Sequence, residues 1–447
     1  MRRFLKLLYP GLGIKRWLLL MFFGLLVVIA AILALILGLS DLRGRAGIFY
    51  QHVLEVFGPR PWWLFLLLIT GLALIIFSGY RFLRSVLGGL TPAEKTVDAL
   101  YQSRYLKRGP KIVVIGGGTG LSTLLRGLKE YTSNITAVVT VADDGGSSGQ
   151  LRGELGMPPP GDIRNCLVAL ADTEPLLETL FQYRFKQGDS LGGHSFGNLF
   201  LAAMSQILGF TEAVKASGKV LAIRGKVLPV TEENLKLKAI CIDGQEIFGE
   251  SNIGLTPEPI SRLELVPQGS KALPEVLDAI AGADAIVVGP GSLYTSLLPN
   301  LLVMGVVDAI AASKAAKMYV CNIMTQVQET RSFTASDHLE VISRHVGTNL
   351  FDYIIVNKQP IGEELLQRYA EEGAEPVKID WDRLRKYGIK VLAADLLQPG
   401  QVAWHNPQAL AKMVLGKAVF HSHNASRLLD NLLLEARLGK ISPRSEE

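Results

Sequence analysis

Two long apolar runs dominate the hydrophobic pattern of the first 80 residues. Residues 17–39 contain no charged side chain, and neither do residues 61–80. Each run is long enough to cross roughly 30 Å of hydrocarbon as a helix. The pattern therefore predicts a membrane anchor at 1–80, with transmembrane helices at about 17–39 and 61–80.

Two other interpretations of these runs fit less well. A secretory signal peptide has a shorter apolar core and a small-residue cleavage site. Buried helices of a soluble core rarely lack charge over such a length. Basic residues are more frequent outside the two runs than in the loop that joins them. By the positive-inside rule, both termini and the main domain are expected to be cytoplasmic, at the inner or plasma membrane.

From Lys111 onward, short apolar strands alternate with amphipathic helical segments. The expected strands are 112–115, 136–141, 285–288, 318–322, 353–357 and 390–393. Fully apolar strands separated by helices are typical of a parallel sheet covered on both faces. We predict an α/β, Rossmann-like domain at 111–440, joined to the anchor by a juxtamembrane connector at 81–110.

Two segments depart from this alternation. Residues 219–260 contain apolar stretches at 227–230 and 235–242, followed by the turn Asp243-Gly244. This pattern predicts short antiparallel strands in a small β-rich insertion. Residues 426–438 form an amphipathic helical pattern that could pack on the domain or join copies into a homo-oligomer.

Composition and charge limit the classes of function that the chain can have. The chain is 49% hydrophobic and carries a net charge of +5, but the basic excess falls within residues 1–110 and the remainder is net acidic. The excess of basic residues in 1–110 therefore indicates contact with a membrane surface, and we expect no nucleic-acid partner. Cys166, Cys241 and Cys321 lie far apart among apolar neighbours, which is typical of reduced cysteines in a cytosolic compartment.

A glycine-rich loop follows the first strand of the predicted domain. It consists of Gly116, Gly117, Gly118, Thr119 and Gly120. Such a loop lets the backbone and a helix N-terminus approach a phosphate. Leu121 replaces the last glycine of a dinucleotide fingerprint, and no lysine completes a P-loop. The loop suits phosphate without matching either motif, and a tight turn without a ligand is the alternative.

Paired acids follow the second strand. Asp143 and Asp144 precede Gly145 and Gly146. The side chains of adjacent aspartates diverge, so one is expected to bind ribose or base and the other a divalent cation such as Mg²⁺. The alternative is that one of them caps the glycine turn through the backbone.

Further polar residues lie near helix starts. Asp162 is a suitable N-cap for a helix at 163–171. Arg164 would then lie in the first turn, where a guanidinium favours a nearby anion; a surface arginine is the alternative. His194 and Asn198 lie among small residues before an apolar helix. His194 is a candidate proton donor or phosphate contact.

The strand at 285–288 and the next strand also end in polar loops. Gly289, Gly291, Ser292, Tyr294 and Thr295 follow the first, with Tyr294 a candidate stacking surface. Asn322 ends the second, and Arg331 follows as a natural diphosphate partner. Ligands bind at the carboxyl ends of parallel strands, so these loops together predict a ligand site.

Together these loops resemble one family. The segments GGGTGLS, VADDGGSSG, PPGDIRN, GHSFGN, GPGSLYTS, CNIMTQ and ETRSFTASDH are similar to those of the YvcK branch of the CofD-like superfamily. The resemblance covers about 110–435 and excludes the anchor. It implies a gluconeogenesis factor that binds UDP-sugars such as UDP-N-acetylglucosamine and supports cell shape and growth on gluconeogenic carbon.

The resemblance also assigns residues. It implies that the loops at 116–120 and 289–295 surround a nucleotide diphosphate, and that Tyr294 and Arg331 contact the sugar nucleotide. Asp143 and Asp144 match the acidic loop that serves metal and substrate in the related CofD enzymes. Those enzymes use magnesium to transfer a phospholactyl or phosphoenolpyruvyl group from a guanosine diphosphate carrier to a deazaflavin alcohol.

Three functions remain open. The first is a UDP-sugar-binding regulator that acts through protein partners. The second is a CofD-like 2-phospho-L-lactate transferase. The third is an NAD-dependent oxidoreductase, which the incomplete fingerprint disfavours. We expect a binding and regulatory protein and assign no catalytic residue.

Overall fold

The computed structural model describes residues 14–39, 62–88, 106–172, 175–188, 191–256 and 258–421. The chain divides into two compact units, one at 1–103 and one at 104–447. The predicted helix at 426–438 lies outside the described residues, as do the loop at 40–60 and most of the connector.

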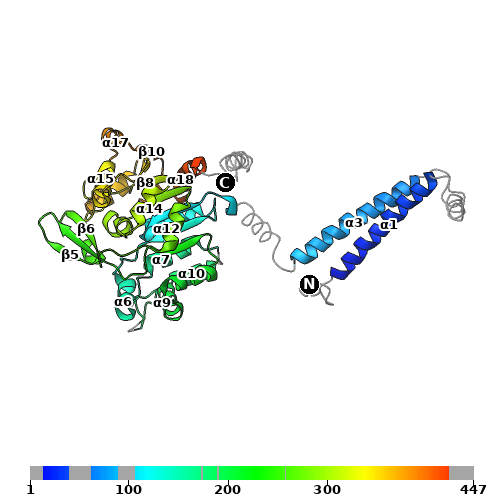
Figure 1. The fold of residues 1–447 in the computed structure, drawn as a ribbon, viewed down its shortest axis with the longest axis horizontal. Helices are drawn as coiled ribbons and strands as arrows, with labels where there is room; N and C mark the ends of the chain where they lie inside the picture. Colours follow the sequence, from blue (N-terminus) through cyan, green and yellow to red (C-terminus); the bar gives the residue numbers. More distant parts are fainter. Residues whose placement is uncertain are drawn as a thin grey trace. The chain divides into compact units, whose positions relative to one another are not determined.

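The described part of the first unit consists of two long helices, α1 (Ile14–Leu39) and α3 (Trp62–Gly88). They run antiparallel, because the ring of Trp17 near the start of α1 packs edge-on against Phe77 toward the end of α3 (Figure 1). Many apolar side chains face outward, including Phe22 at 60% and Ile69 at 61% exposure. Both helices are long and apolar enough to cross a membrane.

Seven parallel strands form the central sheet of the second unit (Figure 1). In spatial order they are β10 (Lys390–Ala394), β9 (Tyr353–Asn357), β8 (Ala316–Val320), β7 (Ala285–Val288), β1 (Ile112–Gly116), β2 (Ile135–Val139) and β3 (Lys226–Pro229). Helices cover the sheet, so every residue of the central strand β7 is buried, whereas the edge strand β10 is only partly covered. The predicted α/β fold with a parallel sheet is confirmed.

Helices connect these strands. Before β7 they are α5 (Gly118–Leu128), α6 (Gly146–Leu155), α7 (Gly161–Leu170), α8 (Pro175–Gln182), α9 (Phe196–Leu208), α10 (Phe210–Val220), α11 (Glu250–Ile253) and α12 (Pro274–Ala281). After β7 they are α13 (Leu298–Leu301), α14 (Val306–Ala312), α15 (Ala335–Val346), α16 (Glu363–Glu371), α17 (Trp381–Tyr387) and α18 (Pro407–His421). Short helical turns at Leu106–Arg108 and Leu293–Leu297 complete the connections.

A separate antiparallel sheet contains β5 (Glu246–Phe248), β4 (Lys236–Cys241) and β6 (Ile260–Val266), in that order. It begins later than the predicted insertion and continues past residue 260. The prediction was wrong for 227–230, because β3 pairs parallel with β2 in the large sheet. The helices α6 to α10 carry the chain back to the other end of the sheet, which a parallel pairing requires.

The strand order reverses between β1 and β7. From β1 the chain builds outward through β2 to β3, and it then returns to place β7 on the opposite side of β1. Such a reversal separates the two loops that leave adjacent strands, and ligands bind in the crevice between them. The loops after β8, β7, β1 and β2 consequently lie side by side at one edge of the sheet.

Candidate functional site

A cavity of about 400 Å³ lies at the carboxyl ends of β1, β7 and β8. This volume is within the range usual for small-molecule sites. The predicted site residues among its lining are Gly117, Gly118, Thr119, Gly120, Gly291, Ser292 and Asn322. None of the lining residues carries a charged side chain at neutral pH, since the one histidine among them, His405, is held neutral by burial. A ligand would therefore meet backbone groups, hydroxyls, amides and aromatic rings.

Close contact between two loops forms the floor of this cavity. A Cβ atom at Gly120 would lie 2.6 Å from the carbonyl oxygen of Pro290, so only glycine fits there. Side-chain amides tie the same region together: Asn322 Nδ2 donates to the Gly291 carbonyl at 3.0 Å, and Gln326 Nε2 donates to Ser292 Oγ at 2.8 Å. Gly116 and Gly289 lie beneath, at the ends of their strands.

The N-terminus of α5 opens toward this cavity. Its N-cap is Gly117, which has no side chain of its own to accept a hydrogen bond from the first turn. Free N–H groups at a helix start favour an anion. The buried carboxylate of Asp162 accepts a hydrogen bond from the backbone of Gly118 and so occupies one of these donors.

The far wall of the cavity was missed by the sequence analysis. It contains Tyr369 from α16 and the segment Ala403–His405 between β10 and α18. Trp404 and His405 follow the parallel strand β10. The expectation that ligands bind at the carboxyl ends of parallel strands would therefore have pointed to this segment as well. Tyr369 carried no such signal, because it is one of several polar or aromatic residues on a surface helix.

The paired acids after β2 lie outside the cavity lining, and both make backbone contacts. Asp143 Oδ1 accepts from the Gly145 N–H at 2.9 Å, which is the turn-capping alternative. Asp144 accepts from the N–H groups of Glu250 at 3.0 Å and Ser251 at 2.8 Å, so it caps α11. The expected divergence of the two side chains is confirmed.

A buried arginine fixes this acidic loop. Arg152 is 5% exposed and donates to the carbonyl oxygens of Ala142 at 3.3 Å, Asp143 at 3.2 Å and Leu235. Burial lowers the pKa of its guanidinium. The loop and the antiparallel sheet are thereby joined through one side chain.

Asp162 does not cap its helix as predicted. The N-cap of α7 is Pro160, and Asp162 lies inside the first turn, directed at the loop after β1. Burial, followed by the charge of Asp143, raises the pKa of Asp162 to about 6. Burial and the charges of Asp143 and Asp144 also raise the pKa of Glu250, to about 7. These acids therefore lie close enough to repel one another.

His194 and Asn198 are held in a buried cluster beside the acidic loop. Ser147 Oγ lies 2.9 Å from Nδ1 of His194 and accepts a hydrogen bond from Asn198 Nδ2 at 3.0 Å. Arg164 donates to Ser195 Oγ and, at 2.8 Å, to Asn165 Oδ1, so it contacts the start of α9. The structure brings these predicted residues together but does not place them in the cavity lining.

Tyr294 is not the exposed stacking surface that was predicted. It is 2% exposed, its hydroxyl donates to the Ile260 carbonyl at 3.3 Å, and its ring packs edge-on against His345. Thr295 Oγ1 donates to Glu329 at 2.7 Å, and the backbone of Tyr294 donates to the same carboxylate at 2.9 Å. Tyr294 is the second residue of the helical turn Leu293–Leu297, and its ring lies in the core.

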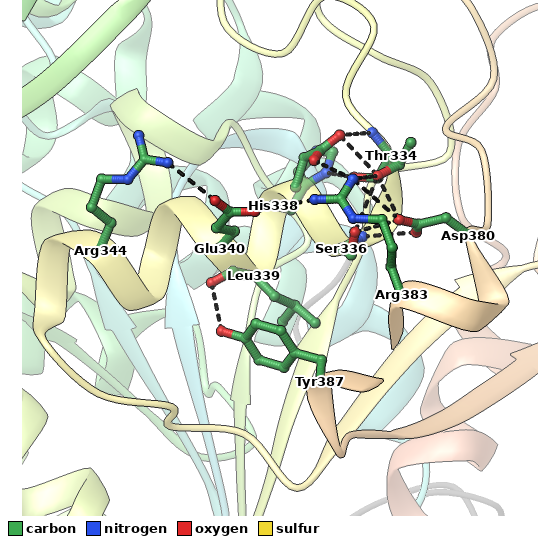
Figure 2. Close-up of polar contacts among 10 residues, drawn as sticks. Thr334, Ser336, His338, Leu339, Glu340, Arg344, Asp380, Arg383 and Tyr387 are labelled. Carbon is green, nitrogen blue, oxygen red and sulfur yellow. Dashed lines mark hydrogen bonds and ion pairs between the residues drawn. The ribbon is translucent and has the colours of Figure 1, made fainter. Parts of the chain in front are cut away.

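Arg331 is exposed and lies on the loop after the cavity residue Gln326. Thr330, the neighbour of Arg331, links this loop to Gln326, because Gln326 N donates to Thr330 Oγ1 at 2.9 Å. Beyond it, Thr334 caps α15 through Asp337 and contacts Asp380 at 2.9 Å, while Arg383 reaches over from α17 (Figure 2). This polar cluster holds the far end of the loop that carries Arg331.

Within the described ranges, no three His, Cys, Asp or Glu side chains are grouped so that they could hold a metal ion by themselves. The cysteines at 166, 241 and 321 are buried and unpaired.

The parallel sheet and the cavity at its carboxyl edge define an α/β domain with a candidate ligand site, and comparison with known families assigns it more narrowly. Residues 112–397 match the family model described as "2-phospho-L-lactate transferase CofD". The chain belongs to this family.

Similar proteins carry more specific names. A "Gluconeogenesis factor" of Bacillus subtilis is 48% identical, over 68% of this chain and 97% of its own. A "Putative gluconeogenesis factor" of Nostoc sp. is 49% identical, over 92% of this chain and 91% of its own. A crystal structure of a UPF0052-family protein from Bacillus halodurans is 49% identical with a TM-score of 0.67, covering 69% of this chain and 99% of that one. These names support the YvcK-type assignment.

Proposed function

We propose that this protein is a membrane-anchored, UDP-sugar-binding regulator of the YvcK type, which links gluconeogenic growth to cell-wall synthesis and cell shape. The observation that carries the proposal is the cavity between the loops of β1 and β7. Its lining combines the backbone donors of the glycine loop with the aromatic side chains of Tyr369 and Trp404. That combination suits a diphosphate joined to uncharged rings.

The diphosphate would lie against Gly118 to Gly120 and Ser292. Because the cavity lining is uncharged, the negative charge of the diphosphate must be balanced by positive groups at the rim of the cavity. Arg331, on the loop that follows Gln326, would supply one positive charge. Replacing Arg331 with alanine should weaken UDP-N-acetylglucosamine binding by about 1.5–3 kcal/mol and leave stability almost unchanged. Equal affinity in calorimetry would remove Arg331 from the site.

A divalent cation such as Mg²⁺ would supply the remaining charge. Both carboxylate oxygens of Asp144 accept backbone hydrogen bonds, so the pair Asp143–Asp144 does not suit a cation. Asp143 and Asp162 fit better, because the charge on Asp143 raises the pKa of Asp162 and a cation would relieve that repulsion. Mg²⁺ is usually held by one or two carboxylates together with phosphate oxygens.

The helices α1 and α3 would anchor the domain to the inner or plasma membrane, with both termini cytoplasmic. Their length, composition and outward apolar side chains support this part of the proposal. Regulatory protein partners or a second copy of the chain would then be met at the membrane surface. Protease accessibility of the loop at 40–60 in intact cells tests the orientation; cleavage confined to the cytoplasmic side would contradict it.

Calorimetry on the full-length chain in detergent tests the binding function, using UDP-N-acetylglucosamine, GDP and NAD as ligands. The proposal predicts binding of the UDP-sugar in preference to the other two. Tight binding of GDP without the UDP-sugar would contradict it.

That second outcome would instead favour a magnesium-dependent CofD-like transferase acting on a nucleotide-diphosphate carrier. The family match at 112–397 is the observation behind this alternative. It further requires a second binding surface for an acceptor, which a competition experiment with a deazaflavin alcohol would detect.

A further inference from the structure

The amino-terminal edge of the large sheet carries a row of exposed basic side chains. The strands are parallel and their starts are aligned, since Ile112 pairs with both Ile135 and Ala285, and Lys390 pairs with Tyr353. Neighbouring strands lie about 5 Å apart, so the edge of this sheet is about 30 Å long. The exposed basic residues at or just before strand starts, which we call the basic edge, are Lys107, Arg108, Lys111, Lys226, Lys314 and Lys390.

Helix ends account for other basic residues at this edge, but not for these six. The helices of a parallel α/β sheet end here, and cations in their last turns are stabilising. That explains Arg126 in α5, Lys219 in α10 and Arg385 in α17. The residues of the basic edge lie outside the α-helices, and none of them forms an ion pair with another described residue. Their charges are therefore available to an anionic surface outside the protein.

The acids at this edge are fewer and are engaged within the fold. In the described loops that lead into the strands, the acids are Glu130, Asp284 and Asp352. Glu130 forms an ion pair with Arg224 at 3.7 Å. Asp284 and Asp352 each accept a backbone N–H of the neighbouring strand, at 2.8 Å and 2.9 Å. These carboxylates hold the strand starts together and leave the edge with an excess of positive charge.

The chain also enters the domain at this edge. Residues 89–105 join α3 to the helical turn Leu106–Arg108. Asn134, just before β2, fixes this entry, because its Nδ2 donates to the carbonyl oxygens of Lys107 at 2.9 Å and Gly109 at 2.7 Å. The acidic loop after β2 lies at the opposite edge of the sheet, as does the cavity. An anionic surface would therefore attract the edge where the chain enters and repel the other.

We propose that the basic edge binds the anionic headgroups of the membrane in which the chain is anchored. Each lysine or arginine close to such a surface strengthens the attraction about fivefold, and the effect falls off within about 10 Å. A row of charges along one edge brings several of them within that distance together. The inference rests on the proposed function, because it requires α1 and α3 to lie in the bilayer. The ligand cavity then opens away from the membrane.

Two cysteine variants of the full-length chain in lipid nanodiscs test this orientation. Lys390→Cys lies at the start of β10, and Lys358→Cys lies just after the neighbouring strand β9, so they report on opposite edges of one strand pair. The native cysteines are buried. We expect an uncharged maleimide to label Lys390→Cys at least about threefold more slowly in nanodiscs with phosphatidylglycerol than in phosphatidylcholine alone. Lys358→Cys should react equally in both.

Salt and charge reversal are the controls. Salt at about 1 M, where the Debye length is about 3 Å, should remove the difference between the two lipids. Combining Lys107→Glu, Lys226→Glu and Lys314→Glu should also remove it, whereas the matched exposed set Lys186→Glu, Lys271→Glu and Lys358→Glu should not. Thermal unfolding of both triple variants confirms that they are folded.

Three results would overturn the inference: equal labelling of Lys390→Cys in both lipids, slower labelling at Lys358→Cys instead, or a difference that persists after charge reversal of the basic edge. Retained binding of UDP-N-acetylglucosamine in the same nanodiscs would leave the proposed function standing. A chain that does not incorporate into nanodiscs would contradict the proposed anchor, and with it the inference.

Discussion

The two sides of Gly117 are built in opposite ways. On one side lies the cavity, which is lined by backbone groups, hydroxyls and aromatic rings and has no charged side chain in its lining. On the other side lie Asp143, Asp144, Asp162 and Glu250, whose carboxylates repel one another. The side rich in charge is tied into the fold by backbone hydrogen bonds, whereas the lining of the neutral side includes the half-exposed ring of Trp404.

This difference shows that charged residues in glycine-rich loops need not be ligand contacts. Asp144 caps a short helix of the insertion, and Arg152 fixes the loop that carries Asp143. Both act by satisfying backbone groups that would otherwise be left unpaired. The site itself depends on how closely two backbones approach, which the glycines allow.

The largest effect is expected at Gly120. In Gly120→Ala the new Cβ atom would lie 2.6 Å from Pro290 O, so the two loops must move apart. We expect a loss of more than about 3 kcal/mol in the free energy of unfolding, together with loss of UDP-sugar binding. Denaturant titration and calorimetry measure both. Gly153→Ala is the control, since no atom lies within 4 Å there and helix α6 should gain about 0.4–1 kcal/mol.

The next effect concerns acid stability and His405. The pKa of this histidine is about 4 in the folded protein against an ordinary value of 6.5, so below pH 6.5 the unfolded chain binds a proton that the folded chain does not. Stability from this group is therefore complete above pH 6.5 and is lost as the pH falls toward 4, by about 3 kcal/mol at most.

Measuring the free energy of unfolding of the parent and His405→Asn from pH 7 to pH 4 isolates this contribution. The difference between the two should change over that interval and be flat above pH 7. Parallel curves would mean that the pKa of His405 is the same in the folded and unfolded chain, which contradicts the effect of burial on its ring.

A smaller effect is expected on the acidic side. Asp144→Ala removes the acceptor for two N–H groups of α11 and should cost about 1–2 kcal/mol. Hydrogen exchange at Glu250 and Ser251 should accelerate while UDP-sugar affinity stays the same. Asp243→Ala, which removes a single exposed backbone contact, is the matched control and should cost less. A large loss of affinity in Asp144→Ala alone would place the ligand on the acidic side.

The smallest effect is expected for Tyr294→Phe. The hydroxyl makes one hydrogen bond of 3.3 Å to Ile260, so its removal should cost about 0.5–1 kcal/mol. Because the ring lies in the core, ligand affinity should not change. A marked loss of affinity without a loss of stability would show that the hydroxyl reaches the ligand.

The sequence predicted the sheet well, because β1, β7 and β9 are continuous apolar runs whose burial on both faces leaves a clear signature. It also located the glycine loops that form one wall of the cavity. It misplaced β3, since a short apolar strand has the same pattern in either sheet. It made Tyr294 a candidate stacking surface for the ligand, because an aromatic residue in a polar loop gives no sign of which way its ring turns.

The opposite wall was harder to predict. Trp404 and His405 lie more than 280 residues beyond Gly117, and the packing of α18 on α5 brings them to the same cavity. Asp144 caps α11 only because the insertion folds back onto the loop after β2. Such contacts between distant segments are not encoded in local spacing.

A crystal structure of the protein with UDP-N-acetylglucosamine and Mg²⁺ tests the central claim most directly. The account predicts that the ligand occupies the cavity between the loops of β1 and β7, with its diphosphate against Gly118 to Gly120 and Ser292. A ligand bound instead beside His194 and Asn198, with the cavity at Trp404 left unchanged, would contradict it.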